Sequence, residues 1–196
     1  MHEAKNFDHL LGMQGMSEQM LKNHFTLYQG YVKNTNLLME NLFALVGGDK
    51  AAGPEFAEQK RRMGWEFNGM RLHEYYFENL TKEKSEMDRS GVLAGAMEKD
   101  FGSVDTWRKD FQATGSMRGI GWAITYFDPQ SGRLMNTWVN EHDVGHIAGA
   151  APILVMDVFE HAFMLDYGLN RADYIAAFFN ALDWNAAEKR FTPFVK

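Results

Sequence analysis

The sequence predicts an α+β fold, in which an N-terminal antiparallel helical hairpin precedes a C-terminal domain with a small three-stranded antiparallel sheet flanked by helices. Two observations lead to this fold class. The first half carries two long stretches with apolar residues at helical steps, and the second half carries short apolar runs typical of strands between further helical patterns. With 196 residues, 45% of them hydrophobic, the chain is long enough to bury a sizeable core.

The hairpin is predicted from two amphipathic stretches. Residues 17–46 begin with Ser-Glu-Gln-Met, which resembles a capping box, and repeat apolar or aromatic residues every three or four positions until a Gly-Gly pair. A second helical pattern follows Pro54 and covers residues 56–80. Two such helices in succession predict an antiparallel pair.

The second half begins after the most polar segment of the chain, residues 81–91, which is the best internal boundary. We therefore expect a helical domain over residues 1–84 and an α+β domain over residues 85–196, with a metal site between them. The elements expected in the second domain are helices over 92–101 and 104–113, strands over 121–127, 133–139 and 153–156, and helices over 173–182 and 185–191.

Composition and charge exclude several classes of function. The formal net charge of −6 argues against a nucleic-acid partner or an anionic membrane surface. The absence of cysteine excludes disulfides, thiolate metal sites and cysteine nucleophiles, so any metal must be held by histidine and carboxylate. No stretch approaches the roughly 18 apolar residues of a spanning helix, and the first residues lack the plan of a signal peptide, so we expect a cytoplasmic protein.

Four residues are candidates for one metal site. His24 and His73 each lie in the amphipathic stripe of one helix of the hairpin and should point inward. Asp157 follows an apolar run, and His161 comes four residues later, so a strand end that enters a helical turn can aim both side chains at one point. An inward histidine is also compatible with a hydrogen-bonded core residue, and spacing alone leaves both interpretations open.

The residues around these candidates carry a more specific pattern. The chain reads Asp157-Val158-Phe159-Glu160-His161-Ala162-Phe163, preceded by Tyr-Val-x-Asn-x-Asn from residue 31, His-x-x-Tyr-Phe from residue 73, Asp-Phe-Gly-Ser from residue 100 and Gly-Ile-Gly-Trp-Ala from residue 119. In this order the pieces resemble the iron/manganese superoxide dismutases, whose signature is Asp-x-Trp-Glu-His-Ala-Tyr. The resemblance covers about residues 7–192.

The resemblance implies that His24, His73, Asp157 and His161 are the protein ligands of one Fe or Mn ion per subunit. It further implies an antioxidant oxidoreductase that converts superoxide to dioxygen and hydrogen peroxide. Nitrogen and oxygen donors without thiolate suit both metals and leave the choice between them open. Two alternatives stay beside this function: a family member that binds metal with lost or altered activity, and a metal-free structural or interaction protein on the same scaffold.

The first helix departs from the family pattern, because it is one residue shorter between ligand and tyrosine. A gapless alignment would make Asn23 the ligand. However, His24, Tyr28 and Tyr31 lie on one helical face, so we choose His24 and predict a regular helix without the family's extra residue. Tyr31 then keeps the family's catalytic position at the access channel, with packing in the core or an interface as the alternative.

The resemblance also implies a group that hydrogen-bonds the metal-bound solvent. One of the family's two places for it holds Gly69 here, so it must come from the segment ahead of Asp157, where His142 is favoured over His146. Arg171 is expected to steer superoxide against the net charge, with a surface salt bridge as the alternative.

Glu160 resembles the family's dimer bridge, in which each glutamate binds the other subunit's ligand histidine. This implies a homodimer, alone or paired into a tetramer, with an exposed helix acid as the alternative. A tyrosine–histidine pair that supports this interface in relatives is replaced here by Met164 and by Tyr28 or Leu27. The aromatic cage expected around the metal consists of Trp122, Phe159, which replaces a tryptophan, Tyr76 and Phe77.

Overall fold

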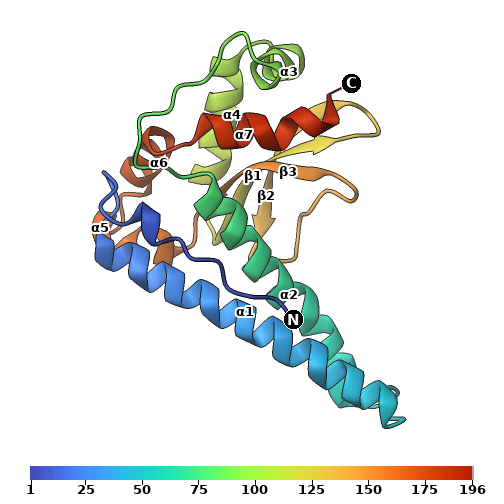
Figure 1. The fold of residues 1–196 in the computed structure, drawn as a ribbon. Helices are drawn as coiled ribbons and strands as arrows, with labels where there is room; N and C mark the ends of the chain where they lie inside the picture. Colours follow the sequence, from blue (N-terminus) through green and yellow to red (C-terminus); the bar gives the residue numbers. More distant parts are fainter. Residues whose placement is uncertain (196) are drawn as a thin grey trace.

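The computed structural model describes residues 1–195. Its N-terminal part is a long hairpin of α1 (Glu18–Gly47) and α2 (Pro54–Glu78), which extends well beyond the rest of the molecule (Figure 1). The chain before α1 runs along this hairpin, where the main chain of His2 exchanges two hydrogen bonds with the Asn36 amide, both of 2.8 Å. The predicted helical hairpin is confirmed.

The ends of the two helices follow from local chemistry. Ser17 caps α1, because its hydroxyl accepts a hydrogen bond of 3.1 Å from the Met20 amide. Pro54 stands in the first turn of α2, where a missing amide hydrogen costs nothing. Helix α1 is α-helical without interruption, so the prediction of a regular helix between His24 and Tyr31 is confirmed.

The C-terminal part combines one sheet with short helices (Figure 1). Its elements are α3 (Val92–Phe101), α4 (Val104–Ser116), β1 (Gly121–Asp128), β2 (Arg133–Asn140), β3 (Ala151–Asp157), η2 (Glu160–Ala162), α5 (Met164–Tyr167), α6 (Arg171–Asn180), α7 (Trp184–Phe191) and η3 (Thr192–Phe194), and η1 (Asp8–Leu10) precedes the hairpin. The sheet has the order β2-β1-β3 with both pairs antiparallel, as predicted. Helices α3 and α4 contact β2, whereas α2 and α7 contact β3.

The register of the sheet brings two residues of the candidate site side by side. β1 and β2 are joined by a tight turn in which the Gly132 amide donates to the Asp128 carbonyl at 2.8 Å. On the other side of β1, Trp122 pairs with Asp157. Since directly opposed residues on antiparallel strands lie close together, this register places the Asp157 carboxylate beside the Trp122 indole.

The structure differs from the sequence prediction mainly at element ends. Helix α6 begins at Arg171 rather than residue 173, because the Asn170 side chain caps it by accepting from the Asp173 amide. Its predicted last residue, Leu182, instead forms a bridge with Leu80. The helical turn expected after Asp157 is present as η2, whereas the short helix α5 was not predicted, because four residues are too few to show a period.

Hydrogen bonds join the end of α2 to the second half of the chain. The Asp183 amide donates to the Asn79 carbonyl at 2.7 Å, and the Asn79 side chain donates to the Val155 carbonyl of β3 at 2.8 Å. These bonds fix α2 against β3. Among residues 1–195, no helix has both the length and the apolar character that a membrane crossing requires.

Candidate metal centre

Three histidine side chains, two from the first half of the chain and one from the second, converge on one carboxylate oxygen of Asp157. Asp157 Oδ2 lies 3.1 Å from Nε2 of His24, 3.1 Å from Nε2 of His161 and 3.6 Å from Nε2 of His73. One ligand atom from each residue lies within 4.8 Å of every other. The side chains of His24, His73 and Asp157 are almost fully buried, whereas that of His161 is 24% exposed.

Asp157 is held from several sides at the end of β3. The Phe159 amide donates to Oδ1 at 2.8 Å, which leaves Oδ2 for the histidines. The Tyr174 hydroxyl, from α6, donates to the Asp157 carbonyl at 2.6 Å. His161 then comes from η2, the turn directly after the strand.

His73 shows which of its nitrogens faces the centre. Its Nδ1 lies 2.5 Å from the Gly69 carbonyl, and because a carbonyl only accepts, Nδ1 carries the hydrogen. In the neutral imidazole Nε2 therefore presents a lone pair, and this buried atom has no hydrogen-bond partner. An unpartnered buried lone pair that faces a carboxylate requires a cation or a donor between them.

The donor set fits a divalent or trivalent metal ion. The three imidazole nitrogens lie 3.1 Å, 3.1 Å and 3.6 Å from Asp157 Oδ2, so the four ligand atoms form one cluster that a single ion could share. Three imidazole nitrogens and one carboxylate oxygen are ligands that suit iron and manganese. His24, His73, Asp157 and His161 would hold the ion.

Burial and mutual charge shift the pKa values of these four groups in different directions. Burial lowers the pKa of His24 and lowers that of His73 well below its ordinary value, so both imidazoles stay neutral. Burial alone would raise the pKa of Asp157, but the adjacent His161 and His24 outweigh it and hold that pKa far below its usual range. Burial likewise opposes protonation of His161, and the carboxylate of Asp157 outweighs it and raises the pKa of His161.

His142 links Trp122, which packs against His73, to Tyr31 by two hydrogen bonds. The Trp122 indole N–H donates to His142 Nδ1 at 3.0 Å, and burial lowers the pKa of His142 to about 4, so the ring is neutral. Its hydrogen is therefore on Nε2, which donates to the Tyr31 hydroxyl at 2.9 Å. The hydroxyl hydrogen of Tyr31 remains free for another acceptor, and burial raises the pKa of Tyr31, so that hydrogen is retained.

Gly69 makes room for the Tyr31 ring. A Cβ atom at residue 69 would lie 2.6 Å and 2.7 Å from two ring carbons of Tyr31. The Tyr31 ring therefore fills the space beside residue 69, and the ring centroid of His142 lies 6.1 Å from that of His73. The ring of Tyr31 also stacks on His73, with centroids 5.2 Å apart.

The aromatic residues expected around the centre surround it. His24 contacts Tyr76 and Phe77 with ring centroids 5.1 Å and 4.9 Å away, and His73 contacts Trp122 at 5.0 Å. Phe159 stacks between His142 and His161, with centroids 4.8 Å and 5.1 Å away. These rings exclude water from all sides except that of His161.

The remaining predicted residues lie farther out. His146 bonds the His142 carbonyl and the Tyr126 hydroxyl rather than any of the four converging side chains. Arg171 donates to the carbonyls of Met117 and Gly119 at 2.7 Å and 2.9 Å, and among the described residues no carboxylate pairs with it. The predicted alternative of a salt bridge within the chain is therefore not formed.

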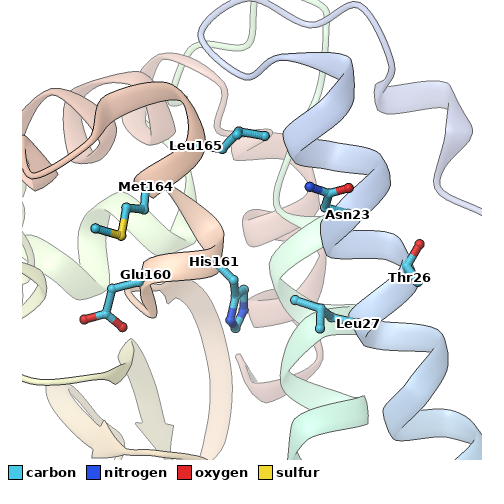
Figure 2. A pocket seen from close by; sticks show the side chains of 7 residues that line it. All are labelled: Asn23, Thr26, Leu27, Glu160, His161, Met164 and Leu165. Atoms are coloured by element: carbon cyan, nitrogen blue, oxygen red, sulfur yellow. The ribbon is translucent and has the colours of Figure 1, made fainter.

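Glu160 and His161 line an open apolar cavity of about 600 Å³ between α1 and the turn that follows β3. Figure 2 shows the His161 ring pointing toward α1 beside Leu27, and the Glu160 carboxylate pointing away from α1. Leu27, Met164 and Leu165 of this cavity are 41%, 47% and 56% exposed. The exposed edge of His161 thus opens onto an apolar surface.

Trp65 is a residue that the sequence prediction missed. Its ring lies 4.6 Å from that of His142 and 5.5 Å from that of Tyr31, and its indole donates to Glu141 at 2.9 Å. The signal was present in the sequence, since residues 65, 69 and 73 follow one another at steps of four and share a face of α2.

The comparisons of this chain with known proteins agree with one another. Residues 89–190 match the family model described as iron/manganese superoxide dismutases, C-terminal domain. A superoxide dismutase [Fe] of Cupriavidus metallidurans is 36% identical over 189 residues, which cover 94% of this chain and 92% of that protein. A superoxide dismutase [Fe] of Saccharolobus solfataricus is 35% identical over 92% of this chain and 87% of its own length, and a superoxide dismutase [Mn] of Haloferax volcanii is 36% identical over 90% and 87%.

A first prediction concerns the space that Gly69 leaves for Tyr31. In Gly69→Ala the ring must move, which should lower the free energy of unfolding by about 1–3 kcal/mol, as for other overpacked sites. The helix propensity of alanine should offset up to about 1 kcal/mol of that loss. Gly64→Ala is the matched control on the same helix, because nothing lies within 4 Å of its new Cβ. That variant should be up to about 1 kcal/mol more stable than the parent, by helix propensity. Denaturant titration measures both, and equal effects would contradict the close contact.

A second prediction concerns pH. The folded chain lowers the pKa of His142 to about 4, whereas the unfolded chain has the ordinary value of about 6.5. Between these values the unfolded chain binds a proton that the folded chain does not, so the contribution of His142 to stability is lost as the pH falls from about 6.5 to about 4. As the pH falls through this window, the free energy of unfolding of His142→Gln should decline less steeply than that of the parent protein. The two slopes should differ by up to roughly 1.4 kcal/mol per pH unit.

Denaturant titrations at several pH values test this dependence. The control His9→Gln removes an exposed imidazole and should keep the slope of the parent protein. The same slope for His142→Gln and the parent would contradict a neutral His142.

Proposed function

The chain belongs to the iron/manganese superoxide dismutase family, and from that premise we propose that it converts superoxide to dioxygen and hydrogen peroxide with one Fe or Mn ion per chain. The observation that carries this proposal is the convergence of three imidazole nitrogens and one carboxylate oxygen within 4.8 Å. The unpartnered Nε2 of His73 supports a bound cation at that point.

We assign the four ligand positions to His24, His73, Asp157 and His161. One carboxylate neutralises only part of the charge of a divalent or trivalent ion, so the centre stays attractive to an anion. When bound, Fe or Mn supplies one-electron oxidation and one-electron reduction by alternating between the +3 and +2 states. The chain's own residues must hold the ion, admit superoxide and deliver two protons for each peroxide formed.

Tyr31 is our proton donor for this reaction. Its hydroxyl accepts the hydrogen of His142 Nε2 at 2.9 Å, which leaves its own hydrogen directed elsewhere. Trp122 in turn keeps the hydrogen of His142 on Nε2 by donating to Nδ1. This order of donors gives His142 the role of orienting Tyr31, and it supports His142 rather than His146 as the group nearest the centre.

Arg171 is our candidate for attracting the anionic substrate. Its guanidinium is held on two main-chain carbonyls and carries its full positive charge, because no carboxylate of the described residues neutralises it. A fixed positive charge raises the local concentration of superoxide around a protein whose net charge is −6.

We further propose that two copies associate through the apolar surface around His161. Glu160 is exposed beside that surface and would accept a hydrogen bond from His161 of the partner subunit, closing the side from which this ligand is open to solvent. The exposed side chains of Leu27, Met164 and Leu165 would supply apolar contact area. We also propose a division into residues 1–84 and 85–196, on the ground of the polar segment 81–91, with the centre between the two parts.

The experiment that tests the function is metal analysis of protein grown in iron-only and manganese-only media, with dismutation assayed on each batch. We expect about one ion per chain, loss of activity on chelation and recovery on reloading. His161→Ala should bind metal at least about tenfold more weakly, and the exposed His9→Ala should bind it normally. Activity without either metal would rule out the proposed function, and full metal content in His161→Ala would rule out the ligand assignment.

A further prediction concerns the association of two chains. Removing the carboxylate in Glu160→Ala should weaken the dimer about tenfold or more, since it leaves an interfacial donor unpaired. Sedimentation velocity over a range of concentrations measures the dissociation constant. Glu98→Ala, an exposed acid on α3, serves as the control and should leave it unchanged. A protein that sediments as a monomer would contradict the proposed interface.

A further inference from the structure

The loop that carries His142 is held in a conformation that it would not adopt by itself. Residues 141–146, called here the His142 loop, connect the end of β2 toward β3 without regular structure. Glu141 has a φ of 48°, in the left-handed region that costs a residue with a side chain energy. Gly145 has a φ of 107°, and a Cβ there would lie 2.5 Å from the Trp138 carbonyl oxygen. Such a conformation persists only where neighbouring contacts hold it.

His146 provides a direct contact to the main chain of His142. Its Nε2 lies 2.8 Å from the His142 carbonyl oxygen and 3.2 Å from the side-chain amide of Asn68. The carbonyl is the closer partner and only accepts, so we place the hydrogen on Nε2, with the Asn68 amide turned so that its oxygen faces Nε2. Nδ1 of the neutral ring is then an acceptor, and it receives the hydroxyl hydrogen of Tyr126 at 2.6 Å. Tyr126 belongs to β1, the central strand, and is 2% exposed. The imidazole therefore ties the His142 loop to the middle of the sheet.

We infer that His146 is a positioning residue, which acts through the main chain of His142 to keep His142 Nε2 aligned on the Tyr31 hydroxyl. Both ring nitrogens of His146 are occupied by hydrogen bonds, so neither is available as a ligand in the metal centre. The Trp65–Glu141 hydrogen bond of 2.9 Å holds the other end of the same loop to α2. This inference rests on the proposed function only where its effect on activity is concerned.

A small displacement of the loop affects both hydrogen bonds of His142. The ring receives from Trp122 at 3.0 Å and donates to Tyr31 at 2.9 Å, on opposite nitrogens. Both bonds require the ring to stay in one place, and Phe159 packs against one face of it. Loss of the His146 contact should therefore loosen the bond to Trp122 and the bond to Tyr31 together.

The test compares His146→Ala with His146→Gln in the full chain. Glutamine reaches about as far as histidine and keeps an N–H for the His142 carbonyl, whereas alanine removes it. Hydrogen exchange of the Trp122 indole N–H, followed by NMR on protein loaded with redox-inert zinc(II), reports on His142 without any activity measurement. The spectrum of Trp122→Phe identifies this signal among those of the 5 tryptophans.

We expect exchange at Trp122 to be at least about tenfold faster in His146→Ala, and the dismutation rate of the iron- or manganese-loaded variant to fall about tenfold. His146→Gln should restore both to within about twofold. Tyr126→Phe removes only the donor to His146 Nδ1. It should speed exchange at Trp122 and lower the dismutation rate, as His146→Ala does but to a smaller extent. This variant tests the inference even if His146→Ala does not fold. Ile147→Val is the matched control, because it trims the neighbouring side chain and leaves all these hydrogen bonds in place.

The outcomes separate the positioning role from the proposed function. Unchanged exchange at Trp122 in both His146→Ala and Tyr126→Phe would overturn the inference, as would the same increase in Ile147→Val or a failure of glutamine to restore slow exchange. If the unmodified protein shows no dismutation, the proposed function fails, while the exchange at Trp122 still decides whether His146 positions His142.

Discussion

A single carboxylate oxygen surrounded by three imidazole nitrogens, in an interior closed to water on most sides, is the constraint on which this structure depends. Asp157 is 0% exposed and ionised, and a buried charge of this kind is costly unless it is compensated. The imidazoles of His24 and His73 stay neutral, and Nε2 of His73 presents an unpartnered lone pair that a cation would satisfy. Because two of the proposed ligands come from the hairpin, one from the end of β3 and one from the turn after it, a bound ion would also stabilise the contact between the two halves.

The positions of the ligand side chains depend on the main chain around them. The pairing of Trp122 with Asp157 across β1 and β3 places the carboxylate in the interior. The hydroxyl of Tyr174, a residue of α6, binds the main-chain carbonyl of Asp157. Hydrogen bonds between Asn79 and both Asp183 and β3 keep the second ligand helix in place. Helix α1 is regular, so the face that carries His24 also carries Tyr28 and Tyr31 and is directed toward α2 and the centre.

The hydrogen-bond chain from Trp122 through His142 to Tyr31 has a fixed direction. A tryptophan can only donate, so each later group in the chain has its donor and acceptor roles assigned by the one before it. The absence of a side chain at Gly69 gives the Tyr31 ring its place, and the strained loop around His142 is held by contacts to β1 and α2. The direction of this chain leaves the hydroxyl hydrogen of Tyr31 free for another acceptor.

The sequence by itself determined the types and order of the main elements, the inward faces of His24 and His73, and the pairing of Asp157 with His161. These features depend on local periodicity and on spacings of four residues. Only the tertiary structure decided that His142 rather than His146 meets Tyr31, that Trp65 contacts both, and that Arg171 binds main-chain carbonyls. Those contacts join residues up to 111 positions apart, and they depend on strand register and on the path of a loop with left-handed residues, which no local pattern encodes.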